Sequence, residues 1–407
     1  MRCSQTLFCA FAMMASSASA QLLPAPLPGP PPLPRVPIAE AADQLATTLE
    51  SGSGALHGYR RQLQNLLRSD RARVVRTPQG DLMLRNEYLA IDAADETLSG
   101  AAATAGFVVA RRDVDDELGF SVTLLRDARS RSPARGLRAL REAMPGIEVE
   151  FNHLYVQAGG LHPQAGAAPR SSPAADATPR MRVGLIDGGV DATLPAFSRI
   201  DMRRHGCDDR AVPQRHGTQV AIRLAGDATG TLYAADLWCG QRISGGTLAL
   251  VDALRWMARE RVAVVNISLV GPDDLVLRRT VDAMHARGHA LIAAAGNDGP
   301  AAAPLFPAAY PDVIAVAAVD AKRRPLPESA AGAHIDVCAP GVIDATRGGR
   351  GTSFAAPLVA QHVAGYWTAA APGRADDALE RLRRDIVDSG KPGPDPRCGA
   401  GVLSPRN

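Results

Sequence analysis

The chain has 407 residues, which is enough for two or three domains with full-sized hydrophobic cores. Its 45 Lys and Arg residues nearly balance its 42 Asp and Glu residues, so the net charge is only +3. That charge gives no broad basic field and argues against a nucleic-acid-binding protein.

The first twenty residues have the features of a secretory signal peptide. Arg2 precedes an apolar run from Leu7 to Ala15, and the segment ends in the small residues Ala18-Ser19-Ala20. The alternative is a buried N-terminal helix, but small residues stand where signal peptides are cleaved. We therefore predict residues 1–20 to be a signal peptide, and export to the periplasm or the extracellular space. No later segment is long and apolar enough for a transmembrane helix.

Residues 21–158 are predicted to contain three parts. Residues 21–37 are rich in proline and indicate an extended linker. Residues 38–85 are polar and partly helical, and their pattern indicates no role. Residues 86–158 show the order βαββαβ, which predicts a small ferredoxin-like domain. Its second helix begins at Pro133, with Ser132 placed to cap it.

Residues 159–180 are rich in Ala, Pro, Ser and Gly without periodicity, which predicts a linker open to cleavage. Residues 181–407 then alternate short apolar runs with helical stretches. Runs of this kind suit parallel strands buried on both faces, and the pattern predicts a doubly wound, mostly parallel α/β sheet. The expected strands are 182–186, 263–269, 290–295 and 313–319, and the expected helices include 248–260 and 274–287.

Four cysteines remain after the predicted signal peptide: Cys207, Cys239, Cys338 and Cys398. Four cysteines allow three pairings, and proximity in the sequence favours Cys207 with Cys239 and Cys338 with Cys398. Free buried thiols are the alternative, because cysteine is also a common core residue. The spacing lacks the Cys-x-x-Cys pairs of a zinc site.

Three segments carry the residues of a serine nucleophile system. Asp187 ends an apolar strand, His216 opens His-Gly-Thr-Gln-Val-Ala, and Ser353 lies in Gly-Thr-Ser-Phe-Ala-Ala-Pro. A serine hydroxyl needs a base to take its proton, and the base needs a third group to hold its tautomer. Each residue alone also has a structural interpretation: Asp187 as a turn former, His216 and Ser353 as helix caps.

A fourth segment, Ala-Ala-Ala-Gly-Asn-Asp-Gly-Pro, places Asn297 directly after a buried strand. Its amide could hold an oxyanion together with the backbone N–H of Ser353, although Asn297 could instead only shape a turn. His205 lacks the Gly-Thr that follows His216 and is interpreted as an ordinary loop residue. Asp208 and Asp209 are interpreted as a solvated turn rather than a calcium site.

These four segments, in the order Asp, His, Asn, Ser, resemble the subtilisin-like serine peptidases, or subtilases. Further matches follow in the same order at residues 265–269, 310–320, 336–341 and 399–403. The resemblance covers residues 181–407 and implies an endopeptidase in which Ser353 is the nucleophile, His216 the base, Asp187 its orienting group and Asn297 an oxyanion donor. It further implies that the substrate is bound by Ser268, Leu269, Val270 and Gly296.

The domain at 86–158 resembles, less specifically, the propeptide that chaperones and inhibits subtilases until it is cut away. The resemblance therefore implies a self-processing precursor whose partners are polypeptide substrates and its own propeptide, and which acts as a monomer. No cofactor is expected. Calcium dependence stays open, because the catalytic region is too compact for several calcium-carrying loops of longer relatives.

One departure bears on specificity. Val270 stands where many relatives have glycine, which predicts a narrower choice of substrate. A different hydrolase class would need a Gly-x-Ser-x-Gly elbow or a glutamate base, which these segments lack. The remaining alternative is a non-catalytic or permanently inhibited protein that keeps the fold for binding.

Overall fold

The computed structural model describes residues 58–115, 117–158, 160–161, 180–210, 212–343, 349–389 and 392–403. The predicted signal peptide, the proline-rich linker and residues 38–57 lie outside the described residues, as does most of the linker predicted at 159–180. Among the described residues, no helix has the length and apolar character needed to cross a membrane.

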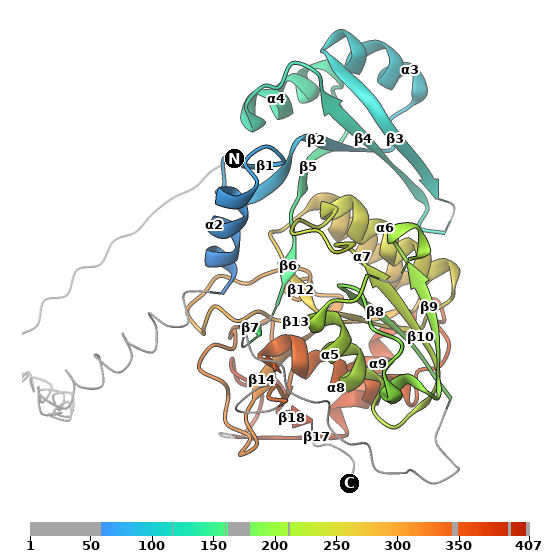
Figure 1. Cartoon of the computed structure of the whole chain (residues 1–407), viewed down its shortest axis with the longest axis vertical. Coiled ribbons are helices and arrows are strands. Elements are labelled where there is room, and N and C mark those ends of the chain that lie inside the picture. The colour runs from blue at the N-terminus through green and yellow to red at the C-terminus, as the bar shows by residue number, and fades with distance from the viewer. Residues whose placement is uncertain are drawn as a thin grey trace, which may run out of the picture. The chain divides into compact units, whose positions relative to one another are not determined.

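A five-stranded antiparallel sheet forms the first domain (Figure 1). Its longest strand, β2 (Leu82–Ile91), pairs with β1 (Val74–Arg76), β4 (Phe120–Asp127) and β5 (Val149–His153), while β3 (Phe107–Asp115) pairs with β4. A helix joins β2 to β3; it begins as α3 (Asp95–Thr97) and continues as a π-helical turn (Leu98–Ala102). A second helix, α4 (Pro133–Ala143), joins β4 to β5. The predicted βαββαβ order is therefore present.

Two details of this domain differ from the sequence prediction. Its first long strand begins at Leu82 rather than after residue 86, and it is preceded by α2 (Tyr59–Ser69) and β1. Ser132 has the backbone conformation of an N-cap, but its side chain makes no capping hydrogen bond. The polar sequence of α2 did not indicate that this helix packs against the rest of the protein, because Tyr59 and Leu63 are the only α2 side chains that are buried.

A nine-stranded sheet forms the second domain, in the order β17-β18-β15-β14-β13-β11-β8-β10-β9. Its strands are parallel except that β17 runs antiparallel to β18. The strands are β8 (Arg180–Asp187), β9 (Ile200–His205), β10 (Thr229–Asp236), β11 (Val264–Ile267), β13 (Ala290–Ala294), β14 (Val313–Val319), β15 (Val337–Pro340), β17 (Ile386–Val387) and β18 (Val402–Leu403). The predicted doubly wound α/β fold is confirmed.

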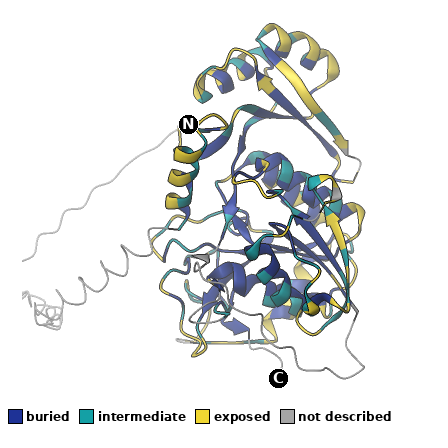
Figure 2. Ribbon diagram, in the orientation of Figure 1, coloured by how far each residue is buried: buried dark blue, intermediate teal, exposed yellow. Residues whose placement is uncertain are grey.

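Helices cover both faces of this sheet, and its central strands are buried throughout (Figure 2). One core contains side chains of α5 (Arg215–Ala225), α8 (Thr352–Ala364) and α9 (Ala375–Arg383). The other contains side chains of α6 (Gly246–Arg259) and α7 (Leu275–Ala286). Alternate side chains of one strand enter opposite cores, as Leu185 and Ile186 of β8 do.

Two predicted boundaries need correction. The apolar run 263–269 is not one strand, because Ser268 separates β11 from β12 (Leu269–Val270). The apolar stretch after Ser353 predicts a helix to about Ala370, but the helix that carries Ser353 ends at Ala364. The first correction matters for function, since β12 leaves the main sheet and pairs with a strand of the first domain's tail, β6 (Val156–Gln157).

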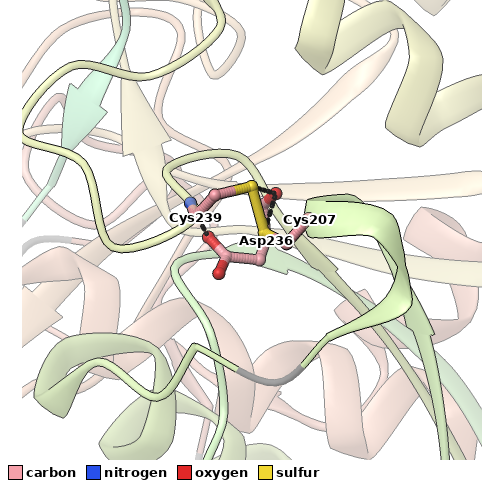
Figure 3. Close-up of side chains that lie close together, drawn as sticks. All are labelled: Cys207, Asp236 and Cys239. Atoms are coloured by element: carbon pink, nitrogen blue, oxygen red, sulfur yellow. Dashed lines mark hydrogen bonds between the residues drawn. A yellow bond between two sulfur atoms is a disulfide. The ribbon is translucent and has the colours of Figure 1, made fainter.

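The structure joins Cys207 to Cys239 and Cys338 to Cys398 in disulfides. The first lies beside Asp236, as Figure 3 shows. These three residues are the one cluster of candidate metal ligands found in the described part of the chain, and both sulfurs are already bonded to each other. Asp208 is exposed, as expected of a solvated turn.

Candidate active site

Asp187 lies at the point in the sheet where the order of strand addition reverses. Strands β10 and β9 lie on one side of β8 in the sheet. Strand β11 lies on its other side, followed by β13 and β14. The carboxyl ends of β8 and β11 therefore flank the crevice in which open α/β sheets bind ligands. Asp187 is the last residue of β8 and is completely buried.

His216 is the second residue of α5 and is 2% exposed. Its Nδ1 lies 2.9 Å from Oδ1 of Asp187, within hydrogen-bonding distance. That oxygen also accepts the backbone N–H of Gly188 at 2.6 Å. A carboxylate at Nδ1 keeps the proton on that nitrogen and leaves Nε2 free to accept one.

Ser353 is the second residue of α8 and is completely buried. Neither its Oγ nor Nε2 of His216 has a hydrogen-bond partner among the described residues. A buried polar atom without a partner costs about 1–3 kcal/mol. Such atoms also occur elsewhere among the described residues, as at Thr77 and Thr123, so the position of these two beside Asp187 is what matters. A hydroxyl and an imidazole nitrogen left unpaired in one crevice are available for proton transfer.

Asn297 follows β13 and lies close to Ser353. Its Oδ1 accepts the backbone N–H of Thr352 at 2.9 Å, which turns its NH₂ group the other way. That group donates to the carbonyl oxygen of Ala158. The same oxygen accepts the backbone N–H of Ser353 at 3.3 Å. Two donors therefore converge on one carbonyl, as they do in an oxyanion hole.

The tail of the first domain lies in this crevice like a bound peptide. Val156 and Gln157 pair antiparallel with Val270 and Leu269 of β12, and the N–H of Ala158 donates to the carbonyl of Ser268 at 3.1 Å. Beyond the crevice, β7 (Gly160–Leu161) pairs with β16 (Gly349–Arg350). Main-chain pairing of this kind holds an extended peptide at a fixed register.

The predicted binding residues surround Ala158. Ser268 and Leu269 provide the pairing edge, and Val270 is 2% exposed. Gly296 has a φ of +111°, and a side chain there would lie 3.2 Å from Leu305 and 3.9 Å from Val270. The side chains of Leu305 and Val270 thus leave little space beside Gly296, which precedes Asn297.

Two carboxyl groups close to the site have altered pKa values. Burial raises the pKa of Asp236, and the neighbouring charge of Asp187 raises it further, against hydrogen bonds from Trp238 and Cys239. Burial also raises the pKa of Asp298, which accepts the backbone N–H of Tyr59 at 2.7 Å. Asp298 directly follows Asn297, so helix α2 is attached next to the candidate oxyanion donor.

Sequence reasoning missed three participants in this site: Gln157, Gln214 and Tyr59. The signal for Gln214 was its place two residues before His216, and the signal for Gln157 was its place at the end of the domain predicted at 86–158, directly before the predicted linker. Nothing in the sequence pointed to Tyr59. His205 is the last residue of strand β9 rather than a loop residue, and it stacks on Trp256 at 5.1 Å between ring centroids.

A model of the subtilase family matches residues 180–401, which is more than half of the chain and contains all four candidate residues. The chain belongs to the subtilase family. Subtilases are serine peptidases, so this chain is a subtilisin-like peptide hydrolase by class.

The sequence is also similar to those of individual subtilases. Subtilisin DY of Bacillus licheniformis is 32% identical over 206 residues, which are 44% of this chain and 74% of that protein. Subtilisin E of Bacillus subtilis (strain 168) is 31% identical over 44% of this chain and 53% of its own length. The chain therefore spans only about half the length of some curated relatives that it matches.

Fervidolysin of Fervidobacterium pennivorans, described as a keratinolytic enzyme related to subtilisin, has a similar fold. Its crystal structure superposes with a TM-score of 0.62 over 79% of this chain and 60% of its own, at 18% identity. The superposed share is larger than the matched subtilase region, so the fold likeness extends beyond that region.

Proposed function

We propose that this chain is a secreted serine endopeptidase, made as a precursor that cleaves its own chain after Ala158. The observation that carries the proposal is the position of the Ala158 carbonyl oxygen, which accepts both the Asn297 amide and the Ser353 backbone N–H. A carbonyl held by two donors beside an unpaired serine hydroxyl is placed for attack.

The proposed reaction uses each candidate residue once. Ser353 Oγ attacks the carbonyl carbon of Ala158 while His216 Nε2 takes the hydroxyl proton. Asp187 keeps His216 oriented through Nδ1, and Asn297 stabilises the oxyanion with the Ser353 N–H. The bond to the next nitrogen then breaks as His216 returns the proton to it, and water releases the acyl group by the reverse sequence.

Residues 58–158 act as the inhibitory pro-region in this proposal, because their tail fills the crevice that a substrate would need. Side-chain contacts support a specific interface with the second domain. Arg111 bonds Asp252 at 2.6 Å, and His153 Nδ1 lies 2.9 Å from Asp274. The Asp274 side chain also caps α7 by accepting from Val276 and Leu277, so the pro-region is bonded to a helix cap of the peptidase domain.

The precursor is proposed to leave the cytoplasm through its signal peptide and to act as a monomer without a cofactor. None of the proposed chemical steps uses a metal ion. Activity that persists unchanged in a calcium chelator would support the absence of a calcium requirement, and loss of activity would contradict it.

The test compares full-length wild type with Ser353→Ala, expressed in a host that lacks its own secreted proteases. Wild type should yield a processed chain whose N-terminus is Gly159, whereas Ser353→Ala should keep residues 58–158 attached. Ser198→Ala, which changes an exposed serine, is the control and should process normally. Processing of Ser353→Ala at the same bond would show that another protease matures the chain.

A permanently inhibited binding protein is the second candidate, and the tail that occupies the crevice is the observation that favours it. An organophosphonate probe separates the two functions. Labelling of Ser353 in processed protein supports the peptidase, and a folded, processed chain that never reacts supports the inhibited protein.

A further inference from the structure

The side chain of Gln157 contacts two residues of the peptidase domain beside the crevice. Its Nε2 donates to Oδ1 of Asp187 at 3.1 Å and to Oε1 of Gln214 at 3.2 Å. Gln157 directly precedes Ala158, whose carbonyl lies in the candidate oxyanion hole. Both acceptors belong to the peptidase domain. A glutamine at the same position of a separate substrate could therefore make the same two hydrogen bonds.

The surroundings hold the two acceptors in place. Gln214 is the N-cap residue of α5, and its backbone N–H donates to the carbonyl of Gly189 at 2.8 Å. A Cβ atom at Gly188 would lie 2.2 Å from Oε1 of Gln214 and 3.0 Å from Nε2 of Gln157. A side chain at position 188 would therefore displace the Gln214 amide from this arrangement.

We propose that Gln214 and Asp187 form a subsite that selects glutamine as the second residue before the cleaved bond. This inference rests on the proposed peptidase function and names part of its substrate class. A primary amide carries two N–H donors on one nitrogen, which matches two acceptors that converge on one point. The preferred substrates are then polypeptides in which Gln precedes a small residue at the cleavage point.

Other side chains fit this pair of acceptors less well. Methionine has a similar length but no donor, and glutamate would bring a second carboxylate to Asp187. Asparagine is one bond shorter, and the ammonium of lysine lies one bond further out than the glutamine nitrogen. Because Gln157 is only partly buried, water can replace a missing donor, so the expected preference for Gln over Met is about tenfold.

The test uses the processed wild-type enzyme, obtained from the full chain, and peptides of sequence Tyr-Val-X-Ala-Gly-Gly with X as Gln, Asn, Met, Glu or Lys. The expected kcat/KM is highest for Gln, about tenfold lower for Met and lowest for Glu. In Gln214→Leu the ratio of Gln to Met should fall towards one. Gln241→Leu is the matched control and should keep the wild-type ratio, because Gln241 lines the adjacent cavity without contacting Gln157 among the described hydrogen bonds.

Equal kcat/KM for Gln and Met in the wild type would overturn the subsite, and so would a ratio that Gln214→Leu leaves unchanged. A preference for Lys over Gln would also overturn it, because it would show that the charge of Asp187 alone recognises the side chain. Should the wild type cleave none of the five peptides, the peptidase proposal itself fails. If Gln214→Leu does not fold, the wild-type panel decides the question.

Discussion

The carbonyl oxygen of Ala158 lies 3.3 Å from the backbone nitrogen of Ser353, although 195 positions of sequence numbering separate the two residues. This contact fixes the register of the tail in the crevice. Each residue directly before Ala158 therefore occupies a definable position along the crevice.

Asn297→Ala should lower kcat for peptide cleavage by about 10²–10³, or about 3–4 kcal/mol of barrier, with little change in KM. This is the size known for the oxyanion-hole asparagine of subtilisin. The reason is that the amide is needed chiefly when the oxyanion forms. Steady-state kinetics on one peptide measure the effect.

Asn297→Asp is the matched variant, because it keeps an acceptor for the Thr352 N–H while losing the NH₂ donors. It should be at least as slow as Asn297→Ala. A loss of less than about fivefold in both variants would mean that Asn297 only shapes its turn.

Val270→Gly should broaden the choice of residue at the position of Ala158. Val270 lies close to Gly296 and pairs with Val156 of the tail, so removing its isopropyl group should open space there, and the ratio of kcat/KM for Ala over Phe at the position of Ala158 should fall at least about tenfold. Val270→Ala should give an intermediate ratio. An unchanged ratio in both variants would show that Leu305 or the backbone, rather than Val270, limits the pocket.

The attachment of the pro-region should weaken as the pH rises above neutral. Burial lowers the pKa of His153, but its hydrogen bond and attraction to Asp274, with the charges of Glu150 and Asp81, outweigh burial and raise the pKa above 6.5. A group whose pKa is raised in the folded state contributes its full stability below pH 6.5 and loses it as the pH passes the raised value. Release of the pro-region should therefore be faster at alkaline pH.

The measurement is the midpoint of thermal unfolding of Ser353→Ala precursor between pH 6 and pH 9, with and without His153→Gln. The second change should flatten the decline of the midpoint with pH. His285→Gln, at a partly exposed histidine outside the interface with the pro-region, is the control. Parallel curves with and without His153→Gln would assign the decline to other groups.

Leu63→Ala should loosen α2 from the tail. The Leu63 side chain is 4% exposed in the core that also contains Leu154 and Val156, so truncation should cost about 2–5 kcal/mol of packing. Gln62 on the same helix donates to the Gln157 carbonyl at 3.2 Å, which connects α2 directly to the tail. We expect a shorter lag before peptidase activity appears.

Activity followed from the start of processing measures that lag, and Gln64→Ala, which changes an exposed residue of α2, is the matched control. An unchanged lag in Leu63→Ala together with an unchanged rate of external proteolysis at α2 would show that the helix does not restrain the tail.

The sequence by itself determined the two domain folds and the four candidate residues Asp187, His216, Asn297 and Ser353. Buried parallel strands appear in the sequence as apolar runs, and Gly188 after Asp187 and Gly351 before Ser353 lie at local bends, so these features depend on neighbours in the chain. The bounds of β14, Val313–Val319, were predicted to the residue for this reason.

Only the tertiary structure decided which bond lies at Ser353, which side chain meets Gln214 and where α2 docks. These contacts join residues far apart in the sequence: 57 positions for Gln157 with Gln214, and 239 for Tyr59 with Asp298. A polar side chain carries no local pattern that names its partner. Its partner is set by how the two domains pack, and packing follows from the shape and burial of both surfaces together.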